Sequence, residues 1–221
     1  MSDLRLLYSS YQVTSQKTVF ERAVKRAIDV VVSMTAIACF GPLFIVAAMA
    51  IMLDSPGPII FRQRRGGLHG KEFIIFKFRT MSVLEDGPVV KQACRDDLRV
   101  TRIGKLLRRS SIDELPQLLN VLRGDMSLVG PRPHALAHDD KYRVHIKGYA
   151  DRYDVLPGLT GWAQVNGLRG ETASLEQMAE RVNYDLWYIS NWSLGLDLNI
   201  LLRTSFSLLR NGFEVFGDRV Y

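Results

Sequence analysis

The feature that most limits how this chain can fold is an apolar run from Val30 to Leu53, 24 residues without a charge. As one straight helix this run would extend about 36 Å, which is enough to cross the hydrocarbon core of a bilayer. Gly41-Pro42 lies near its middle, where the proline removes a backbone donor and clashes with the preceding turn. A core helix of a soluble protein seldom stays uncharged for so long, so the run predicts membrane insertion.

Basic residues stand on both sides of the run and bear on its path through the membrane. Lys25 and Arg26 precede it, and Arg64 and Arg65 follow it. Because basic flanks prefer the cytoplasmic side, a helix that enters, bends at Gly41-Pro42 and leaves on the same face satisfies both flanks. Each half would reach about 16 Å, roughly half the hydrocarbon depth. A plain spanning helix is the alternative.

The C-terminal part carries a second pattern that suits a membrane surface. Apolar residues recur there at helical spacing, at Leu198, Leu201, Leu202, Phe206, Leu209 and Phe213. Polar and basic residues take the opposite side, at Asn199, Arg203, Arg210 and Asn211. Trp187, Tyr188 and Trp192 just upstream favour a helix in the membrane interface. An amphipathic helix packed on its own domain would give the same pattern.

Composition describes a globular protein with a basic surface. The 221 residues are 47% hydrophobic and 24% charged, which is near the globular average and excludes a disordered chain. A net charge of +6 suits a phosphate-bearing partner, such as a nucleotide, an anionic membrane or a nucleic acid. Cys39 lies in the apolar run and Cys94 is the other cysteine, so a disulfide framework is not expected and a reducing, cytoplasmic setting fits.

Periodicity and turn residues predict the elements between the two membrane signals. Residues 56–67 and 71–81 have the pattern of two short strands joined by a Gly-rich turn. Helices are expected over 101–109, over 113–123 and from Ser174 to about Tyr188. The Gly- and Pro-rich segments 130–137 and 155–170 are expected to be ordered loops.

Two carboxylates, Asp113 and Glu114, stand side by side in the segment RRSSIDELPQLLNVLRGDMSLVGPRP. One interpretation is structural: Ser111 with Glu114 forms a capping box, or Asp113 is itself the N-cap of the next helix. The other is catalytic, because a carboxylate among arginines is a candidate nucleophile toward phosphorus. A second carboxylate can hold Mg²⁺, and Arg132, between two prolines, offers a fork for phosphate oxygens. Capping leaves the arginines unexplained.

These residues carry a resemblance to a known family. From about Lys25 to Tyr221 the chain resembles the bacterial sugar transferases, which are monotopic phosphoglycosyl transferases. The resemblance rests on KRAID, the interrupted apolar run, DSPGP, KFRTM, DDLRVTRIGKLLRRSSIDELPQLLNVLRGDMSLVGPRP, PGLTGWAQVNG and NWSLGLDL. GPRPHALAH and GWAQVNGLRGET are most similar to the undecaprenyl-phosphate glucose phosphotransferases, of which this chain would be a short form. Most relatives have Ser-Pro where this chain has Gly41-Pro42.

The resemblance implies a two-step reaction. Asp113 would attack the β-phosphate of a UDP-sugar, release UMP and carry the hexose 1-phosphate until undecaprenyl phosphate accepts it. Glucose is the expected sugar, and galactose or another sugar is the alternative. Asp113 and Glu114 are expected to be catalytic and to hold Mg²⁺. Substrate-binding roles are implied for the residues that match basic and polar motif positions, Lys77, Arg79, Arg108, Arg132, Gln164 and Asn166.

The implied fold is α+β and mainly helical, with a re-entrant membrane helix hairpin, a small cytoplasmic catalytic domain and interfacial amphipathic helices. The expected divisions are an N-terminal extension over 1–24, the re-entrant helix over 25–54 and the membrane-associated catalytic domain over 55–221. The expected location is the bacterial inner membrane, with the catalytic domain on its cytoplasmic face. Expected partners are the UDP-sugar, undecaprenyl phosphate and membrane lipids, without nucleic acid, and a homodimer is left open.

Two other classes of function are compatible with the charge and the anchor. A membrane-tethered module that binds nucleic acid would place basic residues among aromatic ones, but it gives no role to Asp113 and Glu114. A membrane scaffold without enzymatic activity would tolerate the substitution Asp113→Asn. The carboxylate pair therefore favours an enzyme.

Overall fold

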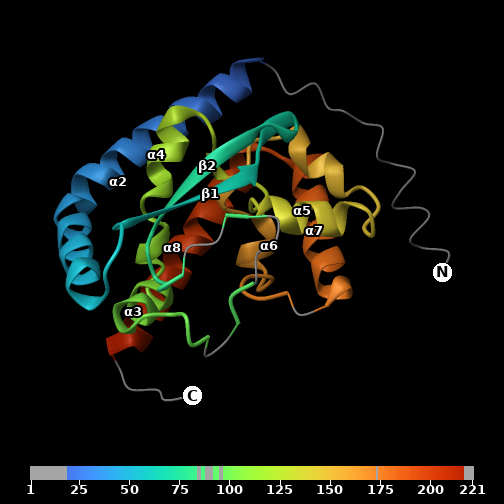
Figure 1. The fold of residues 1–221 in the computed structure, drawn as a ribbon. Helices are drawn as coiled ribbons and strands as arrows, with labels where there is room; N and C mark the ends of the chain where they lie inside the picture. Colours follow the sequence, from blue (N-terminus) through green and yellow to red (C-terminus); the bar gives the residue numbers. More distant parts are fainter. Residues whose placement is uncertain (1–18, 84–85, 88–91, 95–96, 173, 217–221) are drawn as a thin grey trace.

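The computed structural model describes residues 19–83, 86–87, 92–94, 97–172 and 174–216. Residues 1–18 of the predicted extension lie outside this part of the chain. The first element is α2 (Val19–Asp54), a helix of 36 residues with Pro42 inside it. In Figure 1 its ribbon turns between the blue N-terminal half and the light-blue C-terminal half. The predicted break at Gly41-Pro42 is thus a bend in one continuous helix, and the re-entrant path through a membrane stays a prediction.

The apolar side chains of α2 face outward. Among the described helices, α2 is the one long and apolar enough to cross a membrane, and only 11% of its most apolar stretch is buried. Val31, Ile45 and Leu53 are 62%, 63% and 89% exposed. A core helix of a soluble protein would bury such residues, so the structure argues against that interpretation.

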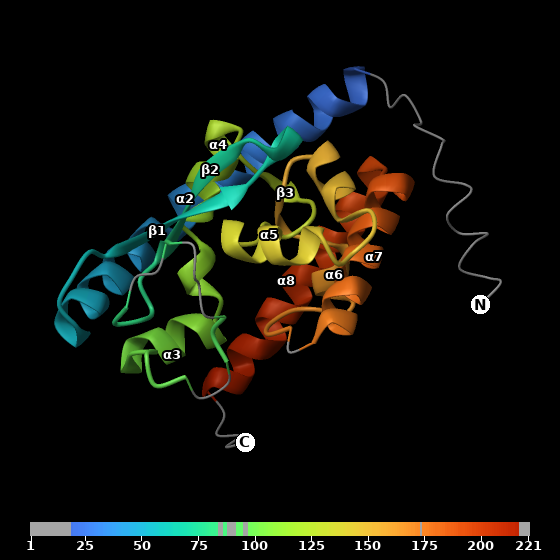
Figure 2. The same cartoon turned by 45° about the vertical axis from the view of Figure 1, so that its right-hand side comes forward.

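Both halves of α2 nevertheless pack on the rest of the protein. Near its N-terminus, buried Asp29 accepts a hydrogen bond from the backbone N–H of Leu128 at 3.0 Å. Near its C-terminus, Ile51 is buried in one apolar cluster with Phe78. The helix therefore lies along the domain over much of its length, as the two views show (Figures 1 and 2).

The predicted strands form an antiparallel hairpin, β1 (Ile60–Gly66) and β2 (Glu72–Phe78), joined through the 3₁₀ turn η1 (Leu68–Gly70). Asn120 of the later helix α4 (Gln117–Arg123) holds β2 in place from the side. Its amide nitrogen donates to the carbonyl of Ile74 at 2.7 Å, and its amide oxygen accepts from the N–H of Phe76 at 3.0 Å. The end of β2 that carries Lys77 is thereby held at a fixed place.

The helices expected over 101–109 and 113–123 are α3 (Arg102–Arg109) and α4 (Gln117–Arg123). Asp113 and Glu114 belong to neither, because they lie in a separate 3₁₀ turn, η2 (Ile112–Glu114). Ser111 has a left-handed φ of 58° and makes no capping hydrogen bond. Both capping interpretations of the carboxylate pair are therefore wrong. With Ser111 as N-cap, Pro116 would be the fifth helical residue, where a backbone donor is needed, and α4 begins immediately after Pro116 instead. Asp113 lies inside η2 and does not precede α4 directly.

A short parallel strand pair was not predicted, and one of its strands lies in the loop expected over 155–170. β3 (Ser127–Val129) pairs with β4 (Gly158–Thr160), and a Cβ at Gly158 would lie 2.1 Å from the backbone nitrogen of Gly130. Only glycine permits this approach of the two backbones. The segments predicted as loops over 130–137 and 155–170 also contain parts of helices. These elements and the intervening 3₁₀ turn are α5 (Leu136–Arg143), η3 (Tyr149–Asp154) and α6 (Trp162–Val165).

Two longer helices complete the chain. α7 (Leu175–Asn191) is the predicted helix, with Ser174 as its N-cap. α8 (Leu194–Phe216) buries Ile200 fully but leaves Leu198, Leu202 and Phe206 59%, 63% and 74% exposed. One side of the helix therefore packs on its own domain, and the place of its exposed apolar side in a membrane interface stays a prediction. The side chains of Leu209, Arg210, Asn211 and Phe213 lie outside the described part. The fold is α+β and mainly helical, as predicted.

Candidate active site

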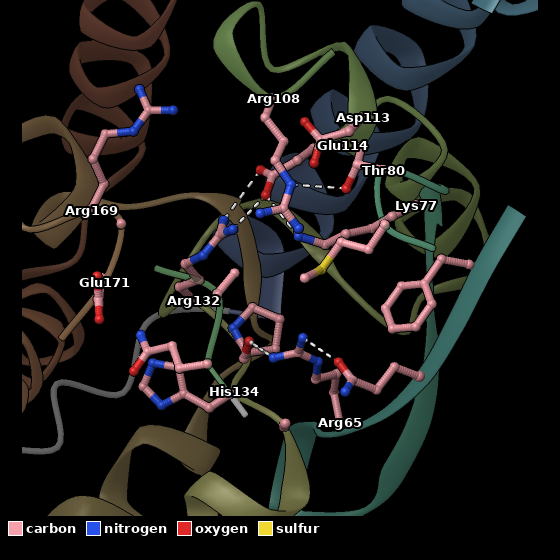
Figure 3. Close-up of a pocket in the computed structure, with 18 of the residues that line it drawn as sticks. Arg65, Lys77, Thr80, Arg108, Asp113, Glu114, Arg132, His134, Arg169 and Glu171 are labelled. Atoms are coloured by element: carbon pink, nitrogen blue, oxygen red, sulfur yellow. Dashed lines mark hydrogen bonds and ion pairs between the residues drawn. The ribbon is translucent and has the colours of Figure 1, made fainter. Parts of the chain in front are cut away.

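A cavity of about 400 Å³ opens between the β1–β2 hairpin, the η2 turn and the loops after β3 and α6 (Figure 3). Eight of its described lining residues are Lys or Arg and three are Asp or Glu, so it suits a ligand with several negative charges. The predicted site residues that line it are Lys77, Arg79, Arg108, Asp113, Glu114, Arg132 and Gln164. Asn166 is not among them.

Asp113 is presented to this cavity by the η2 turn. Its side chain is buried, and no described residue donates a hydrogen bond to its carboxylate. Burial, and after it the charge of Glu114, raises the pKa of Asp113 from 3.8 to about 6. At neutral pH Asp113 is therefore mainly an anion, and no described residue engages its oxygen lone pairs. This is the condition that a carboxylate nucleophile requires.

Glu114, in contrast, is paired on both oxygens. Lys77 Nζ donates to its Oε1 at 2.8 Å, while Arg132 donates from Nη1 to Oε2 at 3.2 Å and from Nη2 to Oε1. Burial favours the protonated acid, but the charges of Arg132 and Lys77 outweigh it and hold the pKa of Glu114 well below 4.5. The two neighbouring carboxylates thus have opposite environments.

Two further arginines reach the cavity beside Asp113. Arg108 Nε donates to Thr80 Oγ1 at 2.8 Å, and in Figure 3 its guanidinium points toward Lys77 and Glu114. Arg169 comes from the loop after α6 and donates from Nη2 to Ser111 Oγ at 3.2 Å. Both can offer their remaining N–H groups to an anion in the cavity.

Two of the predicted substrate contacts have other partners. Arg79 is buried, and its guanidinium donates to the carbonyls of Ser55 and Pro56 at 2.5 and 2.7 Å, just after the end of α2. Its position suits a residue that fastens the end of α2 to the hairpin, because a cation is favourable at a helix C-terminus. Asn166 is exposed and donates to a carbonyl of α6 at 2.7 Å. Gln164 faces the cavity and is the better placed of the two amides.

The cavity also contains residues that sequence reasoning did not select, Arg65, His134, Arg169 and Arg181. His134 is buried, and burial together with nearby arginines lowers its pKa well below 6.5, so it is neutral. His134 and Arg169 fall within the family segments GPRPHALAH and GWAQVNGLRGET, and this position could have indicated both residues as site candidates. Arg65 in a basic strand and Arg181 inside a helix had no such signal.

Asp113 and Glu114 are also the predicted Mg²⁺ ligands. Within the described residues, no group of three or more His, Cys, Asp or Glu side chains could hold a metal. Mg²⁺ commonly takes only one or two carboxylates and completes its shell with phosphate oxygens and water. The oxygens of Asp113 are unengaged, and Glu114 accepts three hydrogen bonds on a group with about four lone-pair sites. The pair therefore fits the ion.

Comparison with known proteins gives independent information. Residues 20–211 match the family model for bacterial sugar transferases. The chain is 62% identical to a UDP-glucose:undecaprenyl-phosphate glucose-1-phosphate transferase of Caulobacter vibrioides, over 84% of this chain and 69% of that protein. A protein of the same name from Escherichia coli strain K12 is 52% identical, over 84% of this chain and 40% of that protein. The exopolysaccharide production protein PSS of Rhizobium leguminosarum is 43% identical, over 85% of this chain and 96% of that protein.

Proposed function

The chain belongs to the bacterial sugar transferase family, and we propose that it transfers glucose 1-phosphate from UDP-glucose to undecaprenyl phosphate, with release of UMP. The names of the Caulobacter and E. coli relatives support this donor and this acceptor. The observation that carries the proposal is the buried, unengaged carboxylate of Asp113 in a cavity lined by eight Lys and Arg residues. Its product would begin the synthesis of an exopolysaccharide or another glycoconjugate.

The proposed chemistry has two displacements at one phosphorus atom. In the first, a carboxylate oxygen of Asp113 attacks the β-phosphorus of UDP-glucose. The bond from this phosphorus to the bridging oxygen breaks, and UMP leaves with that oxygen. In the second, an oxygen of undecaprenyl phosphate attacks the same phosphorus, and Asp113 leaves as a carboxylate. The product is undecaprenyl diphosphate glucose, and the enzyme is regenerated.

Lys77, Arg108 and Arg132 are the proposed diphosphate contacts. Lys77 has three donors and Arg132 has five, and Glu114 engages one of the former and two of the latter. The remaining donors can bind phosphate oxygens while Glu114 keeps both side chains in place. Fixed cations of this kind stabilise the charge that moves onto the leaving UMP. Arg79 and Asn166 are left out of this set because of their other partners.

Mg²⁺ is part of the proposal as the ion held by Asp113 and Glu114. When bound, it would screen the diphosphate charge so that one anion can approach another. The protein's own contribution is the arrangement of the two carboxylates, one unengaged and one fixed by Lys77 and Arg132.

We propose that the catalytic part lies on the cytoplasmic face of the inner membrane. Asp29 and Ile51, which lie at opposite ends of the apolar run of α2, both contact the same domain. About 33 Å of helix separates them, close to the thickness of the hydrocarbon core. If α2 crossed the bilayer upright, the domain attached to both residues would lie within the bilayer as well. This arrangement supports a helix that enters and leaves on one side.

The first test is UMP release from a panel of UDP-sugars. We expect release from UDP-glucose in detergent with Mg²⁺, and stoichiometric release of about one UMP per enzyme when the lipid acceptor is omitted. Sustained turnover should require undecaprenyl phosphate. Faster turnover with UDP-galactose than with UDP-glucose would change the assigned sugar but not the reaction, whereas no release from any UDP-sugar would contradict the reaction itself.

Arg132→Lys is expected to slow turnover by roughly ten- to a hundredfold, on the order of 1.4 to 3 kcal/mol. Lysine keeps the charge but cannot bind Glu114 and a phosphate with a planar fork. Steady-state kinetics of UMP release measure the effect. Arg143→Lys is the matched control, because Arg143 pairs with Asp140 on the exposed surface. Wild-type kinetics for Arg132→Lys would place the phosphate contact elsewhere.

The membrane path can be tested by labelling. Cys39 and Cys94 are free and exposed, so both are first replaced by serine. Single cysteines are then placed at Ser9, which lies outside the described residues, and at Ser82. Because both flanks of the apolar run are basic, we expect both sites to resist a membrane-impermeant thiol reagent in intact cells and to react after lysis. Labelling at Ser9 alone in intact cells would establish a spanning helix.

A further inference from the structure

The segment Pro131–Pro133, called the PRP segment below, is anchored through its backbone from three elements. The carbonyl of Pro131 accepts from the N–H of Gly158 in β4 at 2.8 Å. The carbonyl of Arg132 accepts from Arg152 Nη2 in η3 at 2.6 Å, and that of Pro133 accepts from Arg65 Nη1 in β1 at 3.1 Å. The two prolines have no N–H, so their carbonyls are the backbone hydrogen-bonding groups that they offer. All three successive carbonyls are used.

Arg152 is the anchor of Arg132 itself, and it is part of a buried ion pair. Its Nε donates to Asp185 Oδ2 at 2.8 Å, and the two residues are 4% and 2% exposed. Removing two charges from water is expensive, and apolar replacements of buried ion pairs are often neutral or stabilising. Stability alone is therefore a weak explanation for this pair.

The surroundings of Arg152 restrict its guanidinium to one orientation. The guanidinium carbon lies 5.1 Å from the ring centre of Tyr149, and Nη1 is 3.3 Å from His134 Nδ1. The hydroxyl of Tyr149 donates to Asp139 Oδ1 at 2.7 Å, which fixes the ring. Arg152 does not line the cavity that contains Asp113. Apart from the effect of its charge, it can therefore influence that cavity through the residues that it holds.

We infer that Arg152 and Asp185 are positioning residues for Arg132. Asp185 orients the guanidinium of Arg152, which fixes the carbonyl of Arg132, and this sets the direction in which Arg132 presents its fork to Glu114 and to a diphosphate. Misplacing a group by about 1 Å can cost roughly a hundredfold in rate. The kinetic consequence of this inference rests on the proposed function, but the pairing of Arg132 with Glu114 does not.

The kinetic test is a double-mutant cycle between Arg152→Lys and Arg132→Lys. Lysine can reach either Asp185 or the carbonyl of Arg132 but lacks the planar fork to hold both. We expect Arg152→Lys to lower kcat roughly tenfold in the wild-type background. In the Arg132→Lys background the same change should alter kcat by less than about twofold, because the fork is already lost. Additive effects would overturn the inference, whereas an inactive wild type would contradict only the proposed function.

A second measurement is independent of turnover. Unfolding of the wild type, Arg132→Lys, Glu114→Gln and the double variant gives the coupling between Arg132 and Glu114. Repeating the four measurements with Arg152→Lys present should reduce this coupling by half or more. An unchanged coupling would contradict the positioning role.

The variant Arg152→Met with Asp185→Leu removes both charges and so avoids an unpaired buried ion. It should fold and show the same loss of coupling.

The matched control for general destabilisation is Val182→Ala. Val182 is fully buried on α7, the helix that carries Asp185, and belongs to an apolar cluster with Tyr142, Ile146 and Met178. This change should lower the midpoint of thermal unfolding but leave the coupling and kcat unchanged at temperatures where the protein is folded. Loss of coupling in Val182→Ala would mean that any weakening of this core disturbs Arg132, and the inference would fall.

Discussion

Replacing Asp113 by asparagine is expected to abolish UMP release and, at neutral pH, to stabilise the fold. An amide cannot form the bond to phosphorus that the first displacement requires, so turnover should fall by more than about a thousandfold. Mass spectrometry of the wild type with UDP-glucose and no lipid acceptor should find a hexose phosphate on the peptide that contains Asp113. An adduct on another peptide, or substantial turnover by Asp113→Asn, would disprove the assigned nucleophile.

The expected gain in stability follows from the pKa of Asp113. In the folded protein this pKa is raised from 3.8 to about 6, so between these values the folded state binds more protons than the unfolded state. The ionised carboxylate therefore destabilises the fold above about pH 6, and the effect is relieved as the pH falls toward 3.8. At pH 7 to 8 it amounts to about 3 kcal/mol, which the neutral amide avoids.

Denaturant unfolding in detergent with EDTA, between pH 8 and pH 4, measures this effect. Asp113→Asn should exceed the wild type in stability at pH 8, and its advantage should shrink below pH 6. Asp140→Asn is the control, because the side chain of Asp140 is 68% exposed and its removal should change stability by less than about 0.5 kcal/mol. Equal stability of Asp113→Asn and the wild type at every pH would mean that Asp113 is not a buried anion.

The parts of the fold that follow from local pattern were predictable. Alternating apolar residues and a Gly-rich turn gave the β1–β2 hairpin, and Ser174 ahead of an amphipathic stretch gave α7 with its N-cap. The apolar run gave α2, although a continuous helix bends where the sequence predicted a break. In each case the signal lies within a few residues of the element that it specifies.

The missed features depend on partners that are distant in sequence. β3 and β4 are three residues each, too short for any periodicity, and they are specified by the close approach of Gly130 and Gly158. Nothing near Arg79 in the sequence indicates that its guanidinium would meet the end of α2. The η2 turn was missed for a different reason. The capping motif at Ser111 was inferred from Ser111 and Glu114 alone. Pro116, two residues beyond Glu114, excludes the helix that this motif would cap.

The candidate site was predicted in composition but not in pairing. From the sequence, Lys77 and Arg132 were expected to contact the substrate and Glu114 to hold Mg²⁺, all in one site. The structure brings them together as an ion cluster, which leaves Asp113 as the unengaged carboxylate. Asp113 and Glu114 are adjacent in the sequence, and this adjacency does not indicate which of the two carboxylates will pair with Lys77 and Arg132.

Glu114→Gln is expected to have the opposite effect on stability from Asp113→Asn. The pKa of Glu114 is held well below 4.5, so its charge stabilises the fold above about pH 4.5, and this contribution is lost as the pH falls through the folded pKa. Glutamine would leave Lys77 and Arg132, whose side chains are 17% and 28% exposed, without the anion that they pair with, and Asp113 would be the remaining negative charge near them. The loss should be on the order of 3 kcal/mol at pH 7, and turnover should fall as well because the fork of Arg132 is released.

A second substitution separates lost charge balance from a general defect. Adding Lys77→Met to Glu114→Gln removes one of the two cations that lost their partner, so part of the lost stability should return, although turnover should not. In a wild-type background Lys77→Met should be destabilising, since it removes a cation that Glu114 needs. The same substitution therefore has opposite signs in the two backgrounds, which urea unfolding at pH 7 can measure. If Lys77→Met destabilises both backgrounds equally, then Lys77 contributes packing alone, and the ion cluster does not hold Glu114 as an anion beside Asp113.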